Sequence, residues 1–147
     1  MHALNNAVGF RWQSTDDMEF ACQDYLRVAS WEGSTEDRAN HASPSGWYSS
    51  EVMARAVNTT SMRHAGRIEY TMLLEPLHAN PDALHTSVGA VVNIGNRHWV
   101  ALRSIAGQIW RLDSQDPMPR LMTESSYRSY IDQNRGAFAL VSATTHS

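Results

Sequence analysis

A histidine and a carboxylate fifteen residues apart are the strongest chemical signal in the sequence. His98 begins a run of β-branched and aromatic residues, and Asp113 lies near the end of the next such run. A carboxylate beside an imidazole fixes its tautomer and stabilises its protonated form, which prepares the imidazole to act as a general base. The pair is therefore a candidate for half of a nucleophilic triad. The simpler alternative is a structural or solvated His–Asp contact.

Three short strands are predicted to bring these two side chains together. Strand-forming runs, interrupted by turn residues at Gly95-Asn96 and Ala106-Gly107, cover residues 89–94, 98–105 and 108–114. Because side chains alternate between the faces of a strand, His98 shares a face with Val100, and Asp113 shares a face with Arg111. In a tight antiparallel hairpin the start of one strand lies opposite the end of the next. His98 and Asp113 are therefore expected to be cross-strand neighbours.

The composition indicates one globular domain, residues 1–147, with a core of its own. Charged residues make up 18% of the chain and the formal net charge is -3, so the basic surface of a nucleic-acid-binding protein is not expected. No apolar run approaches the roughly 20 residues of a membrane span, and the N-terminal residues lack the pattern of a signal peptide. We expect a monomer that binds neither nucleic acid nor membranes.

The remaining pattern predicts helices mainly before strands, which favours an α+β fold with an antiparallel sheet. Further elements are predicted from helical spacing, capping residues and strand-forming runs: helices over residues 1–8, 16–29, 50–58 and 123–133, and strands over 67–74 and 136–142. Between the second and third helices, residues 30–46 are rich in Ser, Glu, Asp and Gly, so we expect a mobile surface flap. His41 in that flap is expected to be solvated.

Cysteine and histidine also raise alternatives. Cys22 is the only cysteine, which excludes an internal disulfide and fits a reducing compartment, cytoplasmic or nuclear, although a secreted effector stays open. It lies on the apolar stripe of its helix, so a buried thiol is favoured over a nucleophile. His78 and His85 could be combined with His64 into a metal site, but their spacing matches no recurrent ligand pattern. We expect neither a metal nor another cofactor.

Three motifs occur in order along the chain. They are Met1-His2-Ala3-Leu4-Asn5-Asn6, Gly46-Trp47-Tyr48-Ser49, and His98-Trp99 followed by Asp113-Ser114. Together they resemble the Josephin family of papain-like cysteine proteases, which are deubiquitinases. In that family a catalytic helix carries Cys-x-x-His before Leu-Asn-Asn, a Gly-aromatic-aromatic-Ser segment enters a helix, and His-Trp opens a strand fifteen residues before Asn or Asp.

The resemblance implies roles for individual residues. His98 would be the general base and later the general acid, and Asp113 would orient it. Trp99 would pack beside His98 and shield the pair from water, while His2 and Asn5 would support the site from the first helix. The nucleophilic cysteine would be the residue three before His2, upstream of the printed sequence. The implied fold is papain-like, with N-terminal helices packed on an antiparallel sheet.

The implied substrate is ubiquitin or a ubiquitin-like protein, cleaved at the isopeptide or peptide bond that follows its C-terminus. Substrate contacts would come from Trp47, Ser50 and Glu51, although the last two are polar where the family favours an apolar contact. One alternative is a catalytically inactive module that lacks the nucleophile and binds ubiquitin or another protein through its cleft. A further alternative makes Cys22 the nucleophile of an unrelated arrangement.

Overall fold

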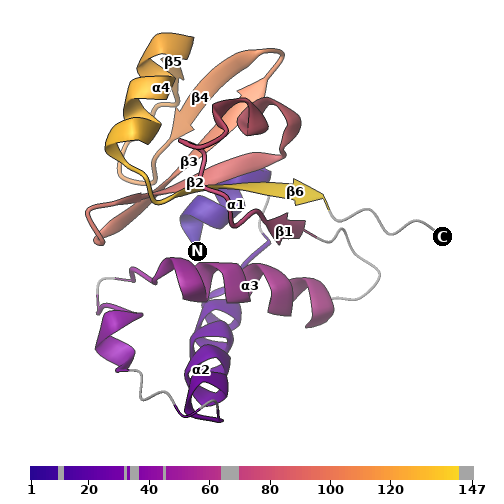
Figure 1. Cartoon of the computed structure of the whole chain (residues 1–147), viewed down its shortest axis with the longest axis vertical. Helices are drawn as coiled ribbons and strands as arrows, with labels where there is room; N and C mark the ends of the chain where they lie inside the picture. The colour runs from indigo at the N-terminus through magenta and orange to yellow at the C-terminus, as the bar shows by residue number, and fades with distance from the viewer. Residues whose placement is uncertain (10–11, 32, 34–36, 45, 64–69, 143–147) are drawn as a thin grey trace, which may run out of the picture.

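The computed structural model describes residues 1–9, 12–31, 33, 37–44, 46–63 and 70–142. Its centre is a six-stranded antiparallel sheet with helices packed against both faces (Figure 1). The predicted α+β class is therefore confirmed. Among the helices of these residues, none combines the length and apolar character needed to cross a bilayer.

The elements follow the predicted order closely. The helices are α1 (His2–Val8), α2 (Thr15–Trp31), the 3-10 helix η1 (Arg38–Asn40), α3 (Ser50–Arg63), the 3-10 helix η2 (Pro81–Thr86) and α4 (Glu124–Gln133). The strands, in their order across the sheet, are β1 (Tyr70–Met72), β6 (Ala137–Ser142), β2 (Gly89–Ile94), β3 (His98–Ile105), β4 (Gln108–Leu112) and β5 (Arg120–Met122).

The central hairpins form where the turn residues predict them. β2 and β3 have the predicted bounds, whereas β4 ends two residues earlier than expected. At the β3–β4 turn Ala106 and Gly107 have φ values of 53° and 79°, and a two-residue type I′ turn requires positive φ at both positions. Gly95 and Asn96 form the turn between β2 and β3, and their φ values of 60° and 57° are also positive.

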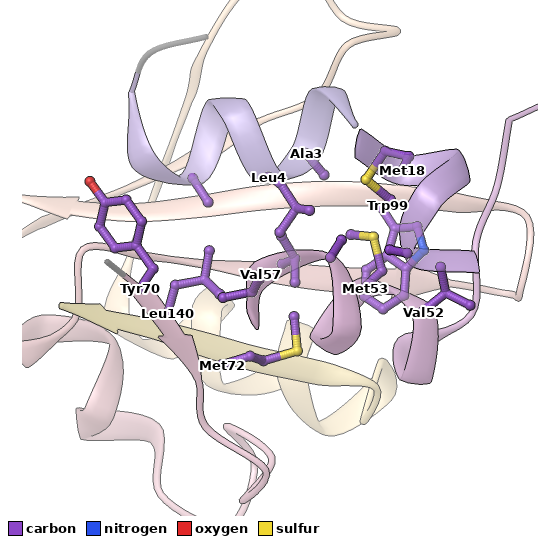
Figure 2. Close-up of a cluster of buried hydrophobic side chains, with 14 of the residues drawn as sticks. Ala3, Leu4, Met18, Val52, Met53, Val57, Tyr70, Met72, Trp99 and Leu140 are labelled. Atoms are coloured by element: carbon purple, nitrogen blue, oxygen red, sulfur yellow. The ribbon is translucent and has the colours of Figure 1, made fainter. Parts of the chain in front are cut away.

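One face of the sheet carries the N-terminal helices. α1 packs on β2, β3 and β4, and α2 packs mainly on α3, so that it projects away from the sheet (Figure 1). Figure 2 shows the core between them, in which Leu4 from α1, Met18 from α2 and Met53 from α3 gather around Trp99 and Leu140 of the sheet. All five are buried, and at roughly 1.5–3 kcal/mol for each large side chain this core fixes α1 to the sheet.

The opposite face is covered by α4 and η2. Tyr127 and Ile131 of α4 and Leu84 of η2 are buried against Leu102 and Ile109 of the sheet. Strand β3 therefore contributes alternate residues to the two cores, as the period of two predicts. Leu102 packs in the core beneath α4, whereas Trp99 and Ala101 pack in the core beneath the N-terminal helices.

Several local predictions differ from the structure. α3 continues five residues beyond its predicted end at residue 58, because Thr60 is buried and its hydroxyl donates to Oε1 of Gln13 at 3.0 Å. β1 is shorter than the predicted strand 67–74, whose first three residues lie outside the described part of the chain. β5 was not predicted; it pairs with β4 at the edge of the sheet.

The expectation for His41 was wrong. Its side chain is buried, and Nδ1 lies 2.8 Å from Oγ of Ser49. A bridge between Ala42 and Tyr48 and an ion pair of 2.8 Å between Arg38 and Glu19 further attach the described part of residues 30–46 to the fold. That the flap as a whole is mobile stays a prediction.

Candidate active site

His98 and Asp113 meet at the open end of the β3–β4 hairpin. Nε2 of His98 lies 2.6 Å from Oδ1 of Asp113. Ala101 pairs with Leu112, so in this register Asp113 follows opposite Val100, with His98 as its diagonal neighbour on the same face. A bond through Nε2 leaves Nδ1 as the ring nitrogen that can accept a proton from a nucleophile.

The surroundings keep Asp113 ionised. Its side chain is 17% exposed, and this partial burial by itself raises the pKa of the carboxyl. Hydrogen bonds from the Gln115 backbone N–H, at 2.9 Å, and from His98 oppose burial, as do the charges of His98 and Arg111, and the pKa falls below its ordinary value. At neutral pH Asp113 is thus a carboxylate anion that orients the His98 ring.

The start of α1 faces this pair. A hollow of about 240 Å³, here called the central hollow, is lined by Met1, by His2 and Ala3 of α1, by His98 and Trp99 of β3, and by Gly46, Trp47, Arg97, Ser114 and Gln115. His2 is exposed at its rim. The geometry thus places the imidazole and the amino end of α1 around one cavity, as the sequence motifs predict. His98 and the amino end of α1 therefore border the same cavity.

Trp99 packs in the core on the opposite side of β3 from His98. It points to the opposite face of β3 from His98 and is 7% exposed, in the core with Met18 and Met53 (Figure 2). Its indole N–H donates to the Tyr48 carbonyl at 2.6 Å. It therefore holds the Gly46-to-Ser49 segment against β3, and its contribution to the His–Asp pair is indirect.

Trp47 forms one wall of the central hollow. Its indole N–H donates to Oδ1 of Asn93 in β2 at 3.1 Å, and Nδ2 of Asn93 donates to Oδ1 of Asn96 in the following turn at 2.7 Å. The wall is therefore tied to the turn that leads directly into His98. The role of Asn93 was not predicted, because the bond joins segments 46 residues apart.

Asn5 acts within the fold. Its Oδ1 accepts from the backbone N–H groups of Trp12 and Gln13, at 2.9 and 2.6 Å, and its Nδ2 donates to the Gln13 carbonyl at 3.0 Å. The buried side chain of Gln13 in turn bonds to the Ala56 carbonyl and to Thr60 of α3. Asn5 thus links α1 to α3 through Gln13, a residue that the sequence pattern did not single out.

Ser50 and Glu51 lie beside the site. They line a separate hollow of about 470 Å³ at the amino end of α3, together with Trp47, Asn93 and Asn96. Glu51 is exposed and Ser50 is partly buried. Trp47 therefore separates this hollow from the central one, and all three predicted substrate contacts lie at one edge of the candidate site.

Cys22 does not line the central hollow. It is fully buried in α2, as predicted, and burial raises the pKa of its thiol, which the nearby Arg38 guanidinium only partly opposes. Nη1 of Arg38 lies 3.6 Å from its sulfur. A buried, protonated thiol is a poor nucleophile.

The described residues contain no group of three or more His, Cys, Asp or Glu side chains arranged to hold a metal ion. His85, one of the histidines weighed for such a site, lies 2.7 Å from Oγ of Ser104 and 3.3 Å from a carboxylate oxygen of Glu124. His64, another of them, lies outside the described residues.

Comparison with known families identifies the family of this chain. The model of the Josephin family matches residues 1–141. The chain belongs to the Josephin family. Josephin proteins are generally cysteine-protease deubiquitinases that bind ubiquitin, and the helices and six-stranded antiparallel sheet agree with their α+β papain-like fold. A search among curated proteins found no match.

Proposed function

We propose that this Josephin chain is the His–Asp part of a cysteine protease that cleaves the bond after the C-terminus of ubiquitin or a ubiquitin-like protein. The observation that carries the proposal is the 2.6 Å contact between His98 and Asp113 beside the amino end of α1. Nδ1 of His98 is available to a nucleophile, and Asp113 is available to stabilise the imidazolium that forms.

In the proposed reaction a cysteine three residues before His2 supplies the nucleophile. Its thiol proton passes to Nδ1 of His98, and the thiolate attacks the carbonyl carbon of the scissile bond. The imidazolium then donates that proton to the leaving amine, and the thioester forms as the C–N bond breaks. Water, deprotonated by His98, hydrolyses the thioester and regenerates the thiol.

The test begins with the coding sequence immediately upstream of Met1. The protein carrying those residues is assayed with ubiquitin bearing a fluorogenic amide at its C-terminus. His98→Ala is expected to lower kcat/KM by about a thousandfold or more, because triad members act as a unit. His85→Ala is the matched control, since His85 also pairs with a carboxylate but lies outside the site. Absence of the upstream cysteine, or of turnover by the unmodified protein, overturns the proposal.

The alternative is a module that binds ubiquitin or another protein without cleaving it. The observation that favours it is that Cys22, the only cysteine of the printed sequence, is buried away from the central hollow. This alternative predicts that ubiquitin binds with an affinity that His98→Ala leaves unchanged, and that no hydrolysis occurs. A measurable hydrolysis rate that His98→Ala abolishes contradicts it.

A further inference from the structure

A second hollow opens behind the His–Asp pair. It has a volume of about 450 Å³ and lies between the β2–β3 turn, the end of β4 and the C-terminal half of α4. Arg97, His98 and Gln115 line both this hollow and the central one. The second hollow therefore adjoins the central one at these three residues, on the imidazole side. We call it the leaving-side hollow.

Two arginines give the leaving-side hollow a positive lining. Arg97 is exposed at its mouth, and Arg111 lies deeper, on β4. The Arg111 guanidinium is 4.0 Å from Asp116, a carboxylate that Arg120 holds more closely at 2.8 Å. Within the described residues, no carboxylate forms an ion pair with Arg97. Arg97 is therefore available to a negatively charged ligand, whereas Asp116 and Asp113 partly neutralise the charge of Arg111.

The one acidic residue of the lining is already engaged. Asp113 lines the same hollow, but its Oδ1 accepts from His98 and from the Gln115 N–H. Burial raises the pKa of the neighbouring Tyr130 phenol, which the Arg111 guanidinium partly opposes, so the phenol stays protonated at neutral pH and can donate a hydrogen bond. The two arginines and this phenol favour an anionic guest over a cationic one.

The chemistry of the proposed reaction indicates which part of the substrate binds in the leaving-side hollow. The imidazolium must reach the leaving amine to protonate it, so the leaving group has to lie on the imidazole side of the nucleophile. We propose that the leaving-side hollow binds the polypeptide that carries the leaving amine, and that Arg97 and Arg111 select sequences with an acidic side chain next to the modified lysine. This inference rests on the proposed function and specifies the substrate class of the same site.

The test compares two substrates that differ only in leaving-group charge. Each is ubiquitin joined through its C-terminus to the lysine side chain of a short peptide, with either Glu or Lys at both flanking positions. We expect kcat/KM to be about fivefold higher for the acidic peptide at low salt, the size of effect that one or two partly exposed ion pairs give. The ratio is expected to approach one at high salt because of screening.

Variants of Arg97 identify the source of the selectivity. Arg97→Glu should reduce or invert the ratio of kcat/KM between the acidic and the basic peptide. Arg97→Lys, which keeps the charge, should retain most of that ratio. Arg27→Glu is the matched control, because Arg27 is exposed on α2, away from the hollow. Equal rates for the two peptides, with the fluorogenic ubiquitin still cleaved, overturn this inference alone. Failure to cleave the fluorogenic ubiquitin overturns the proposed function itself.

Discussion

The indole N–H of Trp47 donates to Oδ1 of Asn93 at 3.1 Å, so a single hydrogen bond joins the wall of the central hollow to strand β2. Asn93 also donates to Asn96, in the turn that leads into His98. Trp47 and His98 are thus both held in place by the β2–β3 hairpin. Loss of this bond is expected to loosen the site before it unfolds the domain.

A double-mutant cycle measures that bond. Trp47→Phe and Asn93→Ala each remove it, so their effects on the free energy of unfolding should overlap by about 1 kcal/mol, the net value of one hydrogen bond. Urea denaturation of the two single variants and the double variant gives the coupling. Trp47→Phe combined with Ser87→Ala, on the far side of the sheet, should be additive. Additivity in the Trp47–Asn93 cycle contradicts the bond.

Gly89 is predicted to be the least replaceable glycine of the sheet. A Cβ built there lies 2.1 Å from the Ala7 carbonyl oxygen, a backbone atom of α1 that cannot move without shifting the helix. Gly89→Ala should therefore cost about 3 kcal/mol or more in the free energy of unfolding. Gly136→Ala is the control, because its Cβ meets the Asn93 Cβ at 3.3 Å and smaller shifts relieve the contact. If the two variants lower the urea midpoint equally, α1 does not pack closely against Gly89 of β2.

The sequence predicted the parts of this fold that depend on local signals. The bounds of β2 and β3 follow from strand-forming runs bounded by turn residues, and the meeting of His98 with Asp113 follows from strand alternation and a two-residue turn. These features need only neighbouring residues and the period of two. They include the pair on which the proposed chemistry depends.

Features that depend on distant partners could not be predicted in this way. His41 looked solvated in its polar segment, yet Ser49 gives it a buried hydrogen-bond partner. Thr59 and Thr60, just beyond the predicted end of α3, are weak helix formers, yet both are buried, and Thr60 bonds to Gln13, 47 residues away. The Arg97 and Arg111 lining of the leaving-side hollow likewise appears only once the β2–β3 turn, β4 and α4 are placed together.

Asp113 is predicted to make the protein sensitive to acid. Its pKa is lowered in the folded state, so its carboxylate stabilises the fold above the unfolded pKa of about 3.9, and this contribution is lost as the pH falls through the lower folded value. The stability difference between the unmodified protein and Asp113→Asn should therefore be largest near neutral pH and shrink below about pH 4. Urea midpoints measured across that range test it.

A substitution that removes no titrating group provides the control for the acid experiment. Ser114→Ala changes the adjacent exposed residue, so its stability difference from the unmodified protein should be independent of pH. The stability difference between the unmodified protein and Asp113→Asn could instead grow as the pH falls. The ionised carboxylate would then be less stabilising than its protonated form, which contradicts the orientation of His98 by an anion.

Cys22 is predicted to be chemically inert in the folded protein. The thiol is fully buried in α2 and burial raises its pKa, so little thiolate is exposed to a reagent. Reaction with an aromatic disulfide at pH 8 should be at least about a hundredfold slower in buffer than in urea, because labelling requires opening of the helical core. The unfolded chain is the internal control, since it contains the same single thiol. Labelling at comparable rates in both states would contradict the burial of Cys22 and restore it as a candidate nucleophile.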